Sequence, residues 1–238
     1  MSTIAPRRSV HHSPTENGAP LLCNGDRMKQ PEFHRLYEAY PEDVKFELIG
    51  GIVYMASPLG RPHGIFHTKL SLALATYETD TPGVEASDNA TAILGEESEP
   101  QPDLALRILP ECGGQSGVNE KDYYTGPPEL VAEIAHSSRA IDMNQKREDY
   151  ERAGVLEYLV FCVKERELHW FHFPSRRMIR PDRQGIARSR VFPGLWIDVP
   201  ALMKRDGKRL TAAVQQGLAG RARAALVKRL EKARKRRA

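Results

Sequence analysis

The sequence has few cysteines and no long hydrophobic run. Its cysteines, Cys23, Cys112 and Cys162, are scattered and odd in number. They form no Cys-x-x-Cys pair, so neither a zinc site nor a disulfide framework is indicated. No segment approaches the roughly 18 consecutive apolar residues that a membrane-spanning helix needs. The N-terminus lacks the apolar core of a signal peptide, and we therefore expect a cytoplasmic protein without a membrane partner.

The excess of positive charge is confined to one end of the chain. The 238 residues are 40% hydrophobic and 28% charged, as is usual for a soluble globular protein. The formal net charge is +4, but from Arg221 onward Glu231 is the only acid among nine basic residues. The rest of the chain is mildly acidic. The net charge is therefore weak evidence for nucleic-acid binding, and the tail is a separate question.

Composition and hydrophobic periodicity divide the chain into three regions. Residues 1–26 are polar and aperiodic, which predicts a disordered tail. Residues 27–205 are expected to form one α/β (α+β) domain, and residues 206–238 a basic helical extension. The periodicity predicts helices at 31–40, 62–77, 142–153, 210–218 and 221–236. It predicts strands at 46–49, 52–55, 84–94, 104–109, 130–135, 156–163 and 168–173. Residues 110–128 are expected to be a loop, 178–191 a hairpin and 192–196 a turn.

Two carboxylates stand in apolar strands. Asp103 directly precedes the strand at 104–109, and Glu133 lies within the strand at 130–135. Side chains alternate along a strand, so Glu133 should share a face with Val131 and Ala135. A charged carboxylate there costs several kcal/mol unless it is paired or bound to a cation. A hard divalent ion shared with Asp103 would remove that cost.

The same residues suit metal-dependent phosphodiester hydrolysis. A divalent ion polarises the phosphoryl oxygen and activates water, and a nearby ammonium offsets charge on the attacked phosphate. Lys146, on the next helix, and Glu47, in another apolar run, are candidates to complete the site. Each residue also has a structural interpretation. Glu133 could be a salt-bridged strand residue, Asp103 a turn residue, and Lys146 a solvated helix residue.

The joint pattern resembles a known family. Its elements are Phe46–Met55, Pro62-His63, Gln101-Pro102-Asp103, Pro128–Ile134 and Ala153–Val160. Together they are similar to the Uma-type restriction endonuclease family, within the PD-(D/E)xK nuclease superfamily. The resemblance spans about residues 25–218. It implies a restriction-endonuclease-like mixed β-sheet flanked by helices, with DNA cleavage that depends on Mg²⁺ or Mn²⁺ and no organic cofactor. Dimers are common in the superfamily, so a homodimer is a further expectation.

Carried over residue by residue, the resemblance assigns Asp103, Glu133 and Glu47 to the metal and Lys146 to the attacking water. Ala135 stands where the superfamily usually has its lysine. This departure motivates an alternative, a catalytically degenerate member that binds nucleic acid or a partner. Three more residues are candidates around the site, each with a structural alternative: His63 (helix cap or packing residue), His136 (core or rim residue) and Gln145 (solvated residue).

The basic tail has two interpretations. An apolar stripe runs through residues 210–230, and Gly217 and Gly220 are expected to interrupt the helix between its halves. The tail could clamp a DNA backbone, because several phosphate contacts give strong, salt-dependent affinity. The interpretation that we favour is a frayed, solvated helix end.

Overall fold

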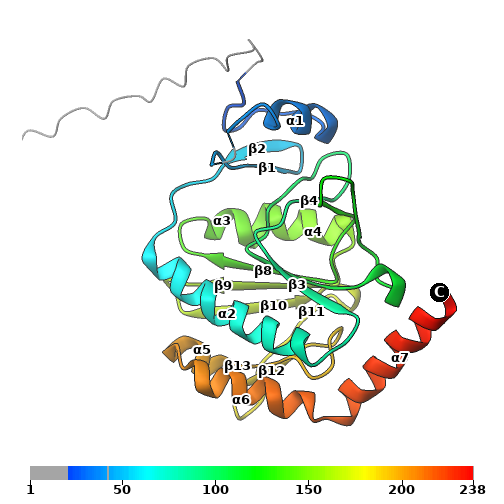
Figure 1. Cartoon of the computed structure of the whole chain (residues 1–238). Helices are drawn as coiled ribbons and strands as arrows, with labels where there is room; N and C mark the ends of the chain where they lie inside the picture. Colours follow the sequence, from blue (N-terminus) through cyan, green and yellow to red (C-terminus); the bar gives the residue numbers. More distant parts are fainter. Residues whose placement is uncertain (1–20, 42, 238) are drawn as a thin grey trace, which may run out of the picture.

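A six-stranded mixed sheet forms the centre of the protein. The computed structural model describes residues 21–41 and 43–237 (Figure 1). The strand order is β11-β10-β9-β8-β5-β3. The strands are β3 (Val84–Asp88), β5 (Leu104–Ile108), β8 (Leu130–Ala135), β9 (Glu157–Cys162), β10 (Glu167–His172) and β11 (Arg177–Met178). Strands β8 and β9 are parallel, whereas the other neighbouring pairs of this sheet are antiparallel.

Helices cover both faces of this sheet (Figure 1). On one face lie α2 (Arg61–Thr79), α5 (Val199–Lys204) and α6 (Gly207–Leu218). On the other lies the crossover from β8 to β9, which consists of α3 (Arg139–Ile141), the π-helical turn η2 (Asp142–Lys146) and α4 (Arg147–Ala153). A parallel pair requires such a crossover. The helix predicted at 142–153 thus begins three residues earlier, and Gly154, with φ +97°, ends it as expected.

The alternation predicted for β8 is confirmed. Leu130, Ala132 and Ile134 belong to the core beneath α2 and α6. Val131 and Ala135 belong to the second core, together with Tyr150 of α4. Glu133 is therefore directed toward the crossover helices.

An N-terminal layer is joined to the rest of the domain by an antiparallel bridge between Leu48 and Glu99. It contains α1 (Gln30–Tyr37) and the hairpin of β1 (Phe46–Ile49) and β2 (Ile52–Met55), with Phe33 in its core. The predicted disorder is wrong for residues 21–26, because Leu22 is buried there and the Gly25 N–H donates to the Val53 carbonyl. The remainder of that predicted tail, residues 1–20, lies outside the described residues.

The connecting segments contain short elements that periodicity did not indicate. The predicted loop 110–128 includes η1 (Pro110–Cys112), β6 (Gly117–Val118) and β7 (Tyr124–Thr125). Strands β6 and β7 form a small sheet with β4 (Ala92–Ile93), so the strand predicted at 84–94 is divided into β3 and β4. A 3₁₀ turn, η3 (Phe173–Ser175), follows β10.

The hairpin predicted at 178–191 is wrong. Met178 pairs with Phe171 of β10, whereas β12 (Ile186–Arg188) pairs with β13 (Trp196–Asp198). The two ends of the segment therefore belong to different sheets. The turn predicted at 192–196 is one residue shorter at its C-terminal end, because Trp196 is the first residue of β13. Ala187 and Ile197 are both fully buried, which favours this pairing over a local one.

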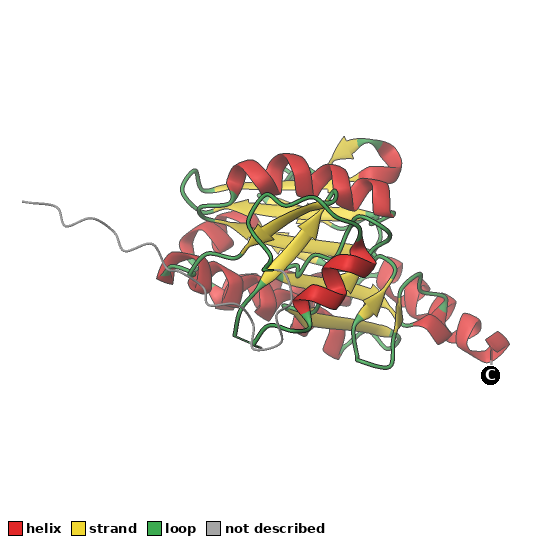
Figure 2. Cartoon of the chain, turned by 90° about the horizontal axis from the view of Figure 1, so that it is seen from above, coloured by secondary structure: helices red, strands yellow, loops and turns green. Residues whose placement is uncertain are grey.

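The C-terminal extension is helical. Helix α6 ends at Leu218 and α7 (Arg221–Arg237) follows, so the predicted interruption is confirmed. A Cβ on Gly217 would lie 2.2 Å from the Gly194 carbonyl oxygen, so only glycine allows this close approach. Figure 2 shows the last helix extending away from the strands. Among the described residues, no helix combines the length and apolarity of a membrane span.

Candidate active site

Asp103 lies just before β5, and its carboxylate is held from two directions. Its Oδ2 accepts hydrogen bonds from the Ile134 N–H at 2.7 Å and from His63 Nε2 at 3.1 Å. Burial opposes ionisation of this carboxyl. The interactions with His63, the Ile134 N–H and the Lys146 ammonium together outweigh burial, and the pKa of Asp103 lies below its ordinary value. Asp103 is therefore an oriented carboxylate anion rather than a solvated turn residue.

Two histidines of α2 position Asp103. The rings of His63 and His67 stack, with their centroids 5.7 Å apart. His63 contacts the carboxylate, and His67 Nε2 lies 3.0 Å from the backbone oxygen of the same residue. The helix N-terminus has no side-chain cap from His63, so its contact with the acid is the one that the geometry favours.

Glu133 is a buried carboxylate at the centre of the site. Its side chain is 5% exposed, and its Oε1 accepts hydrogen bonds from Lys146 Nζ and the Tyr150 hydroxyl, each at 2.9 Å. The Asp103 N–H lies 3.4 Å from its other oxygen. Burial raises the pKa of Glu133 well above its ordinary value, although the Lys146 ammonium opposes the rise. A neighbouring cation favours the charged form of this group against the effect of burial.

Lys146 supplies a buried ammonium from the crossover helix. Its Nζ lies 2.9 Å from Oε1 of Glu133 and 2.9 Å from Oε1 of Glu47. Burial alone would lower the pKa of Lys146, but these two carboxylates and Asp142 raise it well above its ordinary value. Lys146 therefore remains protonated, and the interpretation as a solvated helix residue is wrong.

Glu47 joins the N-terminal layer to the site. It stands in β1, and its Oε1 accepts a hydrogen bond from the Gln101 N–H at 2.8 Å as well as from Lys146. The segment just before Asp103 is thereby attached to β1.

For two further predicted residues, the described part of the chain shows no hydrogen bond or ion pair with the site acids. His136 is half-buried and packs beside Gly60. Within the described residues, no hydrogen bond joins it to the site acids. Gln145 is exposed, which agrees with its interpretation as a solvated residue.

Sequence reasoning missed Asp142 and Tyr150. Asp142 is buried and accepts a hydrogen bond from the Ser138 hydroxyl at 2.6 Å, and burial raises its pKa to about 6. Asp142, Lys146 and Tyr150 are spaced four residues apart, and this spacing brings side chains to one face of a helix. That spacing was the available signal.

The donor set suits a hard cation. Glu47 and Glu133 contact the Lys146 ammonium, and Asp103 and Asp142 interact with it electrostatically, so acidic groups outnumber this cation. In the described part of the chain, no three acidic, histidine or cysteine side chains converge as metal ligands. A three-carboxylate shell that includes Glu47 is therefore not formed, because Lys146 lies between Glu47 and Glu133. Mg²⁺ commonly uses one or two carboxylates together with water and substrate phosphate. Asp103 and Glu133 fit that requirement.

The sheet, its flanking helices and the two strand acids define a restriction-endonuclease-like α/β protein. Residues 30–200 match the model of the Uma2 family, described as "Putative restriction endonuclease". The chain belongs to this family.

A solved structure supports the fold. It is the crystal structure of "a putative nuclease belonging to DUF820 from Anabaena variabilis", which aligns with a TM-score of 0.57 at 13% identity. The alignment covers 72% of this chain and 97% of that one. No curated protein matches the sequence. The comparisons thus establish the family and the fold.

Proposed function

We propose that this protein is a Mg²⁺-dependent endonuclease that hydrolyses phosphodiester bonds of DNA. The observation that carries the proposal is the buried Glu133 carboxylate, which lies beside Asp103 and shares one ammonium with Glu47. Such a concentration of buried charge is costly for stability and is typical of functional sites. The description of the family, "Putative restriction endonuclease", supports this reaction class.

Each residue has a distinct part in the proposed reaction. Asp103 and Glu133 would hold the metal ion, which polarises the phosphate and activates the attacking water. Hydrogen bonds from His63 and the Ile134 N–H to Oδ2 favour the ionised form of Asp103, and among the described residues no hydrogen bond occupies its Oδ1, which is open to a ligand. Glu47 and Glu133 hold the Lys146 ammonium in place, where it offsets charge that develops on the attacked phosphate. Mn²⁺ would serve in place of Mg²⁺.

A second candidate function is binding without cleavage. It is motivated by Ala135, which is 1% exposed in β8 and cannot supply the strand lysine of the superfamily. Lys146 reaches Glu133 from the helix instead, which favours the active enzyme.

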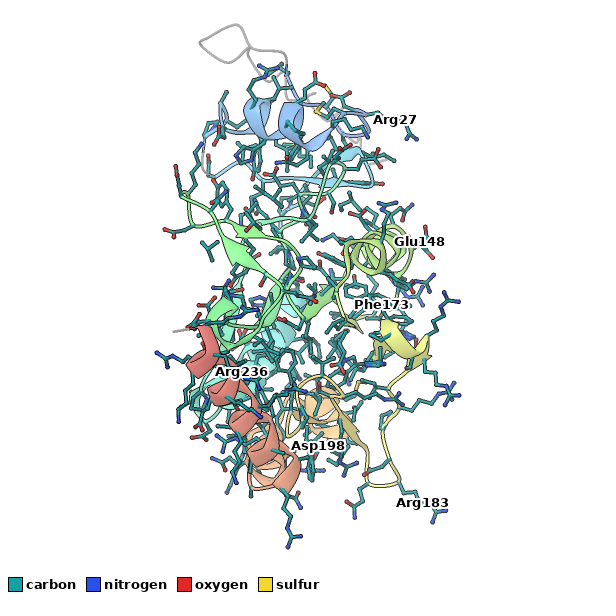
Figure 3. All side chains as sticks on the ribbon, turned by 90° about the vertical axis from the view of Figure 1, so that its right-hand side faces the viewer. Arg27, Glu148, Phe173, Arg183, Asp198 and Arg236 are labelled. Carbon is teal, nitrogen blue, oxygen red and sulfur yellow. The ribbon has the colours of Figure 1, made fainter. Side chains whose placement is uncertain are left out.

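A substrate panel separates the two. The wild-type chain is incubated with supercoiled plasmid, single-stranded DNA and RNA, with Mg²⁺, Mn²⁺ or EDTA. We expect nicking of the plasmid with either ion and none in EDTA. DNA binding without cleavage of any substrate would contradict the enzyme and support the binding member. Glu133→Gln is expected to abolish cleavage, and Glu148→Gln, at an exposed acid of α4, is the matched control (Figure 3).

A further inference from the structure

Helix α7 carries the strongest concentration of positive charge in the chain. It lies outside the residues that match the family. The helix contains nine basic residues and one acid, Glu231. Among the described residues, the ion pairs of the structure involve none of them. This charge is therefore available to a partner.

The helix is fixed to the domain along one side. Leu226 and Leu230 are buried, and Leu230 packs against Gly83. Ala233 lies beside Gly113, and the Arg237 guanidinium donates a hydrogen bond to the Pro110 carbonyl. These contacts extend to the last turn, so the helix is anchored over its length. The interpretation of the tail as a frayed helix end is wrong.

The opposite side presents a row of cations. Arg221, Lys228, Lys232 and Lys235 are exposed. Their spacings of seven, four and three residues return to nearly the same direction at 3.6 residues per turn. The row spans about 21 Å at 1.5 Å per residue. Figure 3 shows α7 at the molecular surface, with Arg236 near its end.

A regular polyanion fits this row better than the other anionic partners do. Double-stranded DNA carries about one negative charge per 1.7 Å of its axis, so a straight row of cations can meet several phosphates. Stable attachment of a helix to a lipid surface uses exposed apolar side chains beside the charges. The leucines of α7 face the domain, and the exposed large hydrophobic residues of the described chain lie in other elements.

We propose that the outward face of α7 binds the phosphate backbone of nucleic acid. The choice of nucleic acid rests on the proposed function. Helix α7 packs on η1, which follows the end of β5, whereas Asp103 precedes its start. The five residues of β5 separate these positions by about 17 Å. Helix α7 thus adds affinity at a distance from the reacting phosphate, and it leaves the chemistry unchanged.

The test measures binding in EDTA, where the proposed cleavage cannot occur. Fluorescence anisotropy follows a 30-bp DNA duplex between 50 and 200 mM salt. The variant of the full chain replaces four cations of α7 by glutamine: R221Q, K228Q, K232Q and K235Q. The control removes the same charge from exposed positions elsewhere: K164Q, R180Q, R183Q and K204Q. Figure 3 shows Arg183 well away from Arg236.

We expect the α7 variant to bind DNA at least tenfold more weakly at 100 mM salt. The slope of log K against log salt should fall in magnitude by up to about 3.6, or 0.9 for each lost phosphate contact. With Mg²⁺, its KM should rise while kcat is unchanged. A variant that keeps the wild-type affinity and slope, or matches the control, would overturn the inference. The inference would also be overturned if the α7 variant lost binding to anionic phosphatidylserine vesicles while its DNA binding stayed intact.

The same assays separate this inference from the proposed function. If the wild type binds DNA through α7 but cleaves no substrate, the inference stands and the nuclease proposal fails. If the α7 variant cleaves and binds like the wild type, the nuclease proposal stands and the inference fails. An RNA duplex of the same length, used in parallel, shows which nucleic acid binds more tightly.

Discussion

Removal of the Lys146 ammonium gives the sharpest prediction of stability. Lys146→Met keeps most of the length and volume of the side chain but removes the charge that Glu47 and Glu133 share at 2.9 Å. Breaking a buried ion pair from one side costs about 3–5 kcal/mol, because the remaining charge is uncompensated. We therefore expect the free energy of unfolding to fall by about 3–5 kcal/mol in EDTA at pH 7.5.

The assay is urea denaturation followed by circular dichroism, with EDTA or with Mg²⁺. A divalent ion bound by Glu133 restores part of the lost charge compensation, so Mg²⁺ should recover part of the stability of the variant. The double variant with Glu133→Gln should be less destabilised than the sum of the two single changes. Lys204→Met, at an exposed lysine of α5, is the matched control and should change stability by about 0.5 kcal/mol or less. A loss below about 1 kcal/mol for Lys146→Met would refute the reasoning.

Three further changes test neighbouring features. His63→Ala releases the Asp103 carboxylate and should lower the Mg²⁺-dependent cleavage rate about 10–100-fold, with Lys208→Ala as an exposed control on α6. The pKa of Asp142 in the folded protein is about 6, above its ordinary value of 3.8. Protonation of Asp142 therefore stabilises the fold, fully below about pH 4, and this contribution is lost as the pH rises through 6. Urea denaturation should therefore show wild-type stability falling by about 3 kcal/mol relative to Asp142→Asn between pH 4 and 7, and parallel pH curves would contradict this. Glu157 accepts hydrogen bonds from Trp170 Nε1, the Ser189 hydroxyl and two backbone N–H groups. Glu157→Gln should therefore lower the free energy of unfolding by about 1–3 kcal/mol in the same assay. An unchanged urea midpoint would contradict this prediction.

The two strand carboxylates were accessible to sequence reasoning because strand geometry is local. The alternation around Glu133 depends only on its neighbours Val131 and Ala135, and the structure shows the same pattern. The position of Asp103 at the start of a buried strand is equally local. Composition and motif order were sufficient for the family and for the class of fold.

The rest of the site depends on long-range contacts. Lys146 meets Glu47 across 99 residues of sequence, and no periodicity encodes that pairing. The π-helical turn η2 also changes the helical register at Lys146, so the four-residue spacing of Asp142, Lys146 and Tyr150 indicates a shared side of the helix but not its burial. In the same way, β12 pairs with β13 rather than with residues adjacent to it in sequence. This pairing buries Ala187 and Ile197, which local periodicity does not indicate.

The central claim is that Asp103 and Glu133 hold a divalent ion for phosphodiester hydrolysis. The most direct measurement is the single-turnover rate of plasmid nicking in Mg²⁺ by the wild type and by Asp103→Asn, with circular dichroism to verify that both are folded. The account predicts measurable nicking by the wild type and a loss of at least 100-fold in the folded variant. Equal rates for the two proteins would contradict it.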